Sequence, residues 1–88
     1  MKVKDGFVLR QIAETWVVVP IGQRVVEFNG LVSLSESAAL LWSMLEKGAK
    51  QQELLDALLT EYKIDEETAL IDIESFIDCL REKGFLEE

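Results

Sequence analysis

The sequence predicts a small α+β domain in which an N-terminal three-stranded antiparallel sheet is followed by three helices. Two observations carry this prediction. The first third of the chain is dense in β-branched and aromatic residues, and the remainder repeats apolar residues at helical spacing. A third observation is that no repeat and no low-complexity linker interrupts the 88 residues. A chain of this length builds one modest core, so we expect residues 1–88 to form a single domain.

Two strands are expected before the only proline. Phe7 to Ile12 form the first strand, Ala13-Glu14 turns the chain, and Thr15 to Val19 form the second strand. Pro20 then stands at a strand end, where the loss of its N–H costs little. Gly22-Gln23 is expected to turn the chain again.

The third strand contains an ambiguity at Asn29-Gly30. An extended pattern resumes over residues 25–28 and continues over residues 31–34. Asn-Gly between apolar runs is a strong hairpin signal, which would make 31–34 a fourth strand. The dipeptide is equally compatible with a bulge inside one long third strand, and we favour three strands with a bulge or kink. The last strand is short and apolar on both faces, so we expect its outer edge to be open to another peptide.

The first two helices follow this strand directly. Ser35 is expected to cap a helix that Gly48 ends, and Glu36 complements the helix dipole in its first turn. A second helix is expected over residues 51–62, with a weak start because Lys50 is a poor cap. The apolar stripe of the first helix, with Trp42 as a core anchor, consists of Ala38, Leu41, Trp42 and Leu45.

The third helix has the clearest boundaries. Asp65 is expected to cap its start, and Gly84 stops it after the basic residues Arg81 and Lys83. Phe85-Leu86 is then expected to fold back onto the helix as the apolar partner of a Schellman-type end. The buried stripe of this helix consists of Ala69, Ile73, Phe76, Ile77 and Leu80. We also expect the strand residue Trp16 to lie in the core.

Composition removes most catalytic functions. The chain has no histidine and one cysteine, Cys79, which is too few ligands for a zinc, haem or iron–sulfur site. The commonest general base is missing, and neither a Gly-x-Ser-x-Gly motif nor a phosphate-binding glycine loop occurs. We therefore expect no enzyme activity, no metal and no cofactor. A lone cysteine and the lack of a signal peptide or membrane span predict a cytoplasmic protein.

The acidic half of the chain restricts its partners. Residues 1–48 are neutral, whereas residues 49–88 carry twelve acidic and four basic side chains, which accounts for the net charge of −8. Such a charge repels nucleic acid and anionic lipid, so neither is expected as a partner.

Four stretches of the sequence together resemble the PqqD family. They are Gly30 to Ser35, the LWSML run from Leu41 to Leu45, Tyr62, and the REKGFL run from Arg81 to Leu86. The resemblance extends from Phe7 to Leu86 and rests on modestly specific motifs. It implies a small winged-helix-like domain that binds the leader segment of a ribosomally made precursor peptide. Such domains, also called precursor-peptide recognition elements, present the peptide to a separate modifying enzyme.

The resemblance also implies a binding site in which the leader peptide adds as a strand beside the third strand, against the third helix. The strand part consists of Gly30, Leu31, Val32, Ser33 and Leu34. If the N–H of Val32 faces the peptide, proline at this position would abolish binding. One flank of the helix presents Asp72, Phe76, Cys79 and Lys83, and the other presents Leu70, Glu74, Ile77 and Arg81. We choose the first flank because it mixes apolar surface with one acid and one base, although the sequence does not force that choice.

Two other functions share some of these features. A winged-helix DNA-binding domain has the same fold, but the expected recognition helix, residues 65–83, carries seven acidic and two basic residues. An acidic acyl-carrier protein has similar size and charge, but the Asp-Ser-Leu attachment motif does not occur. The sequence does not identify the precursor or the modifying enzyme, which could be radical-dependent, lasso-type or of another kind. Both a monomer and a strand-exchanged dimer are compatible with an open strand edge.

Overall fold

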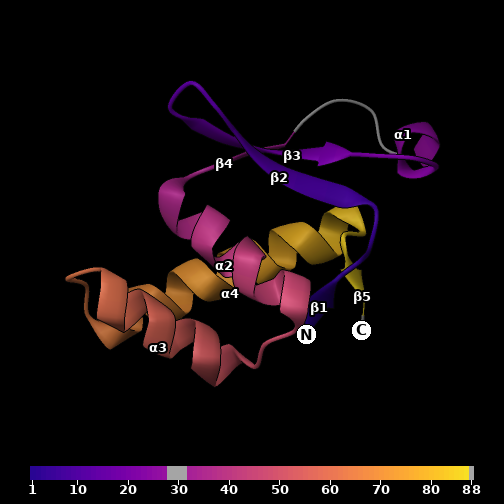
Figure 1. Cartoon of the computed structure of the whole chain (residues 1–88). Coiled ribbons are helices and arrows are strands. Elements are labelled where there is room, and N and C mark those ends of the chain that lie inside the picture. Colours follow the sequence, from indigo (N-terminus) through magenta and orange to yellow (C-terminus); the bar gives the residue numbers. More distant parts are fainter. Residues whose placement is uncertain (28–31, 88) are drawn as a thin grey trace.

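The three-stranded sheet packs on a layer of helices, as the computed structural model shows for residues 1–27 and 32–87 (Figure 1). Its strands are β2 (Phe7–Ile12), β3 (Thr15–Pro20) and β4 (Val32–Leu34), in the order β2-β3-β4 with both pairs antiparallel. The predicted antiparallel sheet and the α+β class are thereby confirmed. The predicted turn is also confirmed, with Ala13 at a φ of 57°. That value fits the hairpin turns whose twist matches the flanking strands.

The segment after β3 is helical rather than extended. Arg24–Glu27 forms a single helical turn, α1, so the expected extended run over residues 25–28 is wrong for its described part, residues 25–27. The Arg24 side chain explains the change: its Nε donates to the carbonyl of Asp5 at 2.9 Å, and its guanidinium lies 5.8 Å from the Phe7 ring centroid. This tertiary anchor outweighs the β propensity of the two valines. Asn29-Gly30 lies outside the described residues.

The predicted helices and their caps are confirmed. They are α2 (Glu36–Lys47), α3 (Gln51–Glu61) and α4 (Glu66–Lys83). Ser35 Oγ accepts a hydrogen bond from the N–H of Ala38 at 3.2 Å, and Gly84 adopts the left-handed conformation that ends α4. The start of α3 is better supported than expected, because Glu53 accepts a hydrogen bond from the N–H of Lys50 at 2.9 Å.

A second, two-stranded sheet joins the two ends of the described chain. β1 (Lys2–Val3) pairs antiparallel with β5 (Leu86–Glu87). Sequence periodicity did not predict either strand, because two residues are too short to show an alternation. The pairing holds Leu86 and Phe85 in the core, so the expected fold-back after Gly84 is confirmed.

One apolar core joins the sheet to the helices. Trp42 of α2 is completely buried, together with side chains from β3, α2, α3 and α4; the largest are Leu41, Leu45, Leu54, Leu58, Ile73, Leu80 and Val18. The prediction that Trp42 is a core anchor is therefore confirmed. The prediction for Trp16 is wrong: this side chain is only half-buried and lies outside the core cluster.

Candidate functional site

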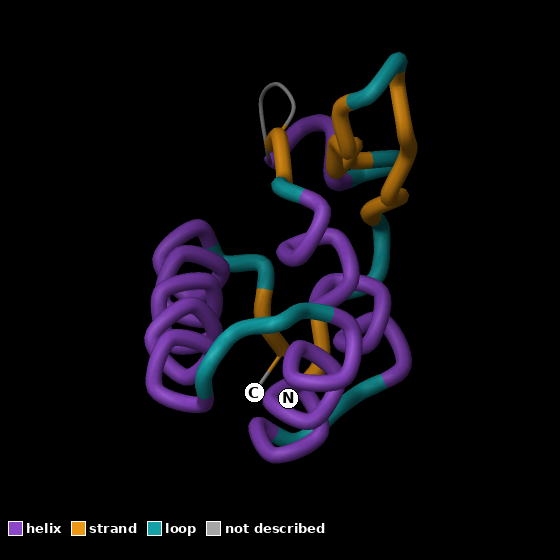
Figure 2. Tube along the Cα trace, turned by 90° about the vertical axis from the view of Figure 1, so that its left-hand side faces the viewer, coloured by secondary structure: helices purple, strands orange, loops and turns teal. Residues whose placement is uncertain are grey.

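The β4 strand forms one edge of the sheet. Among residues 1–27 and 32–87, its only strand partner is β3, on one side. In Figure 2, β4 and α4 lie on the same side of the molecule, and the β2–β3 hairpin lies on the other. Within the described residues, the outer edge of β4 therefore has no strand partner on the side of α4.

The two-residue turn of the hairpin sets the direction of the backbone groups in β3. Ile12 and Thr15 flank this turn and form a hydrogen-bonded pair. Backbone groups alternate in direction along a strand, so every second residue from Thr15 faces β2 and the residues between face β4. Trp16 and Val18 consequently direct their N–H and C=O groups toward β4.

This alternation leaves Ser33 as the described residue whose backbone faces outward. Val32 and Leu34 stand opposite Val18 and Trp16, and their N–H and C=O groups point to β3. Ser33 stands opposite Val17, between these pairs, and points its backbone groups away from the sheet. The condition stated for Val32 is thus not met, because the Val32 N–H faces β3. Ser33, rather than Val32, directs its N–H away from the sheet.

The side chains of β4 alternate in the same way. Val32 and Leu34 are half-buried and pack against the core, whereas the Ser33 side chain is exposed. The strand is therefore held in place by one face, and no strand of the described residues pairs with its outer backbone edge. Gly30 and Leu31, the other two predicted strand residues, lie outside the described residues.

One flank of α4 forms a cavity with the chain that follows β4. The cavity has a volume of about 260 Å³, and Asp72 and Phe76 line it together with Ser35 at the end of the strand. Its remaining lining residues come from α2, α3 and α4: Ser37, Ala38, Leu41, Leu58 and Ser75. Phe76 is half-buried against the core, and Asp72 is exposed. An apolar wall with one carboxylate at its rim can receive an apolar side chain and a polar or basic neighbour.

The other predicted residues of this flank do not line the cavity. Cys79 and Lys83 are exposed and lie one and two turns farther along α4 than Phe76. The opposite flank borders a different cavity, of about 210 Å³, in which Glu74, Ile77 and Arg81 meet the N-terminal end of the chain. Asp72 and Phe76, rather than Glu74 and Ile77, therefore lie near the end of β4.

Sequence reasoning missed Ser75 and Ser35 as lining residues. A signal for Ser75 existed, since it follows Asp72 by three positions and precedes Phe76, which places it on the same helical face. Ser35 was identified as a cap, and that role brings the first turn of α2 to the end of β4. No group of three or more potential metal ligands occurs in the described part of the chain.

Other proteins share this architecture. No curated protein matches the chain. The solved structure of TbiB1 in complex with the TbiA(β) leader peptide is 30% identical, with a TM-score of 0.78 over 99% of this chain and 95% of that chain. The structure of lasso peptide synthetase B1 complexed with the leader peptide is 21% identical, with a TM-score of 0.76 over 99% of this chain and 96% of that chain, which shows a shared fold.

No helix in the described residues is long and apolar enough to cross a membrane. The family model described as Coenzyme PQQ synthesis protein D (PqqD) matches residues 15–86, which is most of the chain. Because that match includes β3, β4 and the whole helical layer, the chain belongs to the PqqD family.

Proposed function

We propose that this chain binds the leader segment of a ribosomally made precursor peptide and presents it to a separate modifying enzyme. The observation that carries the proposal is the outward-facing backbone of Ser33, two residues before Ser35, which lines a cavity on α4. An extended peptide that pairs with this edge continues the sheet by one strand, and its side chains alternate between solvent and the α4 surface. The peptide complexes of TbiB1 and of lasso peptide synthetase B1 support the same role.

The site consists of a strand part and a helix part. Ser33 supplies the backbone hydrogen bonds, and the cavity lined by Asp72 and Phe76 receives side chains of the bound peptide. Cys79 and Lys83 extend this surface along α4 for a longer peptide. The predicted positions Gly30 and Leu31 directly precede Val32 in the sequence.

The chain acts as a binding partner rather than as a catalyst, and it works in the cytoplasm, where precursor peptides are made. Its affinity comes from backbone pairing, so it tolerates changes in the peptide sequence at positions that face solvent. Its acidic α4 disfavours duplex DNA as a ligand, since each phosphate contact requires a cation.

The decisive experiment compares two substitutions at one position. Ser33→Pro removes the outward N–H while leaving the hydrogen bonds of Val32 and Leu34 to β3 in place. Ser33→Ala keeps the N–H and serves as the matched control. Binding is measured by fluorescence anisotropy with the labelled TbiA(β) leader peptide, which is bound in the structure of the 30%-identical TbiB1.

We expect Ser33→Pro to weaken leader binding by about tenfold or more, because the lost bond leaves a peptide carbonyl unpaired. Ser33→Ala should bind like the parent chain. Equal affinity of a folded Ser33→Pro variant and the parent would refute strand addition at β4.

A further inference from the structure

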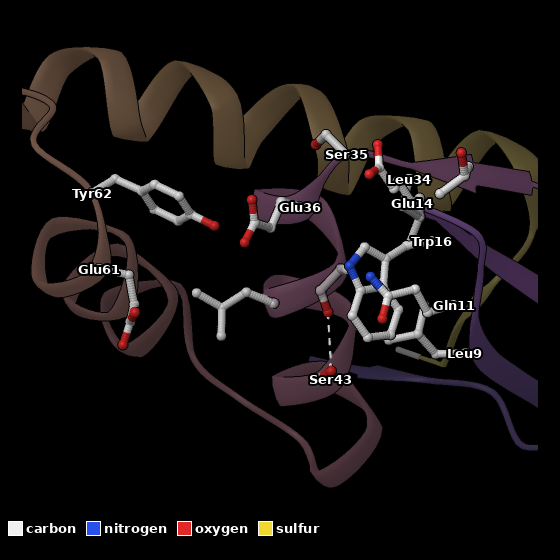
Figure 3. A pocket seen from close by; sticks show the side chains of 13 residues that line it. Leu9, Gln11, Glu14, Trp16, Leu34, Ser35, Glu36, Ser43, Glu61 and Tyr62 are labelled. Carbon is white, nitrogen blue, oxygen red and sulfur yellow. Dashed lines mark hydrogen bonds between the residues drawn. The ribbon is translucent and has the colours of Figure 1, made fainter.

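A third pocket lies on the side of the molecule away from α4. It has a volume of about 550 Å³ and opens between the β2–β3 hairpin, the start of α2 and the end of α3 (Figure 3). Leu9 of β2 and Leu40 of α2 supply apolar walls. The pocket borders the proposed leader site at Leu34 and Ser35, but none of its lining residues belongs to α4. A ligand in this pocket therefore leaves the α4 side of β4 accessible.

Three carboxylates from three different elements border this pocket. Glu14 comes from the hairpin turn, Glu36 from the first turn of α2, and Glu61 from the last turn of α3. No lysine or arginine lines the pocket, and no ion pair joins these carboxylates to a basic residue within the described ranges. Their charges are therefore not neutralised in the free protein.

Two aromatic side chains complete the pocket. Trp16 is half-buried and lies outside the core, so its ring forms part of the pocket wall. Tyr62 lies on the other side, and in Figure 3 its hydroxyl and the Glu36 carboxylate point toward each other. Burial raises the pKa of Tyr62, and the negative charges of Glu36 and Glu61 raise it further. The Tyr62 hydroxyl therefore stays protonated and keeps a hydrogen-bond donor beside these carboxylates.

We propose that this pocket receives an arginine side chain from the surface of the modifying enzyme. Aromatic faces bind a guanidinium through cation–π contact, and carboxylates bind it through charge-assisted hydrogen bonds. A planar guanidinium can use both at once, which a compact ammonium group does less well. The proposal rests on the proposed function, because it supplies the second contact that a presenting domain requires.

Charge complementarity selects this occupant over a second copy of the chain. The chain carries a net charge of −8, so two copies repel each other, whereas a basic enzyme surface is attracted to the three carboxylates. The leader peptide is not the occupant either, because its proposed strand lies at the outer edge of β4. The enzyme and the peptide would then contact two sides of the same domain.

The first experiment probes the pocket with a small ligand. The ¹⁵N-labelled chain is titrated with the blocked tripeptide acetyl-Gly-Arg-Gly-amide, and with the same tripeptide carrying citrulline, the uncharged counterpart of arginine. We expect the arginine peptide to shift the Trp16 indole N–H resonance and the amides near Glu36 and Glu61. The citrulline peptide should not shift them. Equal shifts with both peptides, or no shift at these positions, would overturn the proposal.

The second experiment measures the enzyme itself. The modifying enzyme is first isolated by pull-down with the parent chain, and its affinity is determined by biolayer interferometry for the parent chain and for a Glu36→Gln/Glu61→Gln variant. We expect about fivefold weakening for each lost carboxylate, and less difference at high salt. Glu46→Gln is the matched control, since Glu46 is exposed on α2 and does not line the pocket. Unchanged enzyme affinity in the double variant would overturn the assignment to the enzyme.

Leader binding separates this proposal from the proposed function. The Glu36→Gln/Glu61→Gln variant should bind the labelled leader peptide like the parent chain, because both substituted residues lie outside the α4 cavity lined by Asp72 and Phe76, although Glu36 directly follows Ser35. Loss of leader binding in this variant would show that the pocket belongs to the leader site and would overturn the proposal. Loss of leader binding in Ser33→Pro alone supports the proposed function. The enzyme affinities of the second experiment then decide the proposed pocket contact.

Discussion

The indole of Trp42 meets the ring of Phe85 edge to face, with 5.9 Å between ring centroids and 90° between ring planes. Phe7 completes the cluster at 6.1 Å from Trp42 and 4.7 Å from Phe85. Both Trp42 and Phe85 belong to stretches that carry the family resemblance, the LWSML and REKGFL runs. Their contact shows that these stretches act in packing, because they bind the end of α4 to the middle of α2 and to β2.

Replacement of Phe85 should therefore destabilise the whole domain. Phe85→Ala removes a buried ring from this cluster, and we expect the free energy of unfolding to fall by about 3–5 kcal/mol. Urea unfolding followed by circular dichroism measures this change. Phe85→Leu keeps most of the apolar volume and should cost clearly less. Similar stability of Phe85→Ala and the parent would show that the cluster does not support the core.

Proline at Val32 and proline at Ser33 should differ in their effect on the stability of the domain. The Val32 N–H points to β3, so Val32→Pro breaks a hydrogen bond within the sheet and should lower the free energy of unfolding by about 1–3 kcal/mol. Ser33→Pro removes an outward N–H and should leave stability nearly unchanged. Thermal unfolding of both variants checks this contrast. The reverse order of stabilities would mean that the register of β4 is shifted by one residue.

Asp65 should make the stability of α4 depend on pH. Hydrogen bonds from the side chain and the backbone N–H of Thr68 hold the pKa of the Asp65 carboxyl below its ordinary value of 3.8. Since the folded pKa is lower than the unfolded pKa, the ionised carboxylate stabilises the fold. This contribution is complete above the unfolded pKa and is lost as the pH falls through the folded pKa.

The measurement compares the parent chain with Asp65→Ala in urea unfolding at neutral pH and at several values below pH 3.8. The parent should be more stable at neutral pH, and the difference should shrink in acid. Asp65→Asn keeps a capping oxygen that does not titrate, so it should differ from Asp65→Ala by a constant amount. A difference between parent and Asp65→Ala that does not change with pH would contradict this account of the cap.

The two flanks of α4 are distinguished by a pair of exposed carboxylates. Asp72→Asn changes the flank that borders the cavity beside β4, and Glu74→Gln changes the opposite flank. We expect Asp72→Asn to weaken leader binding by up to about fivefold, as for an exposed charged contact, and Glu74→Gln to have no effect. Fluorescence anisotropy with the labelled leader measures both. A loss confined to Glu74→Gln would assign the peptide to the other flank.

Local chemistry explains why the helices were predictable. Ser35 and Asp65 cap their helices with the side-chain bonds that their residue types favour, and Gly84 takes the left-handed conformation that ends α4. Each of these interactions joins residues only a few positions apart, so the chain carries the information locally. Four of the five predicted stripe positions of α4 are buried as helical spacing predicted, namely Ala69, Ile73, Ile77 and Leu80, whereas Phe76 is half-buried.

Contacts between residues far apart in the sequence explain which structural features the sequence did not predict. The β1–β5 pairing joins Val3 to Leu86, and α1 is held by the bond of Arg24 to Asp5. Trp16 resembles a core residue in its strand, yet the twist of the hairpin places it on the wall of a pocket with Tyr62. No local sequence pattern predicts these positions, because they depend on how the helices and strands pack against one another.

The sequence by itself determined the class of the domain, the order of the three sheet strands and the three long helices, the ends of those helices and the acidic character that disfavours nucleic acid. These properties depend on composition and on interactions within a few residues. Only the tertiary structure decided that Ser33 rather than Val32 faces outward, and that Asp72 and Phe76 lie near the end of β4. The reason is that strand register and helix orientation are set by the packing of side chains far apart in the chain.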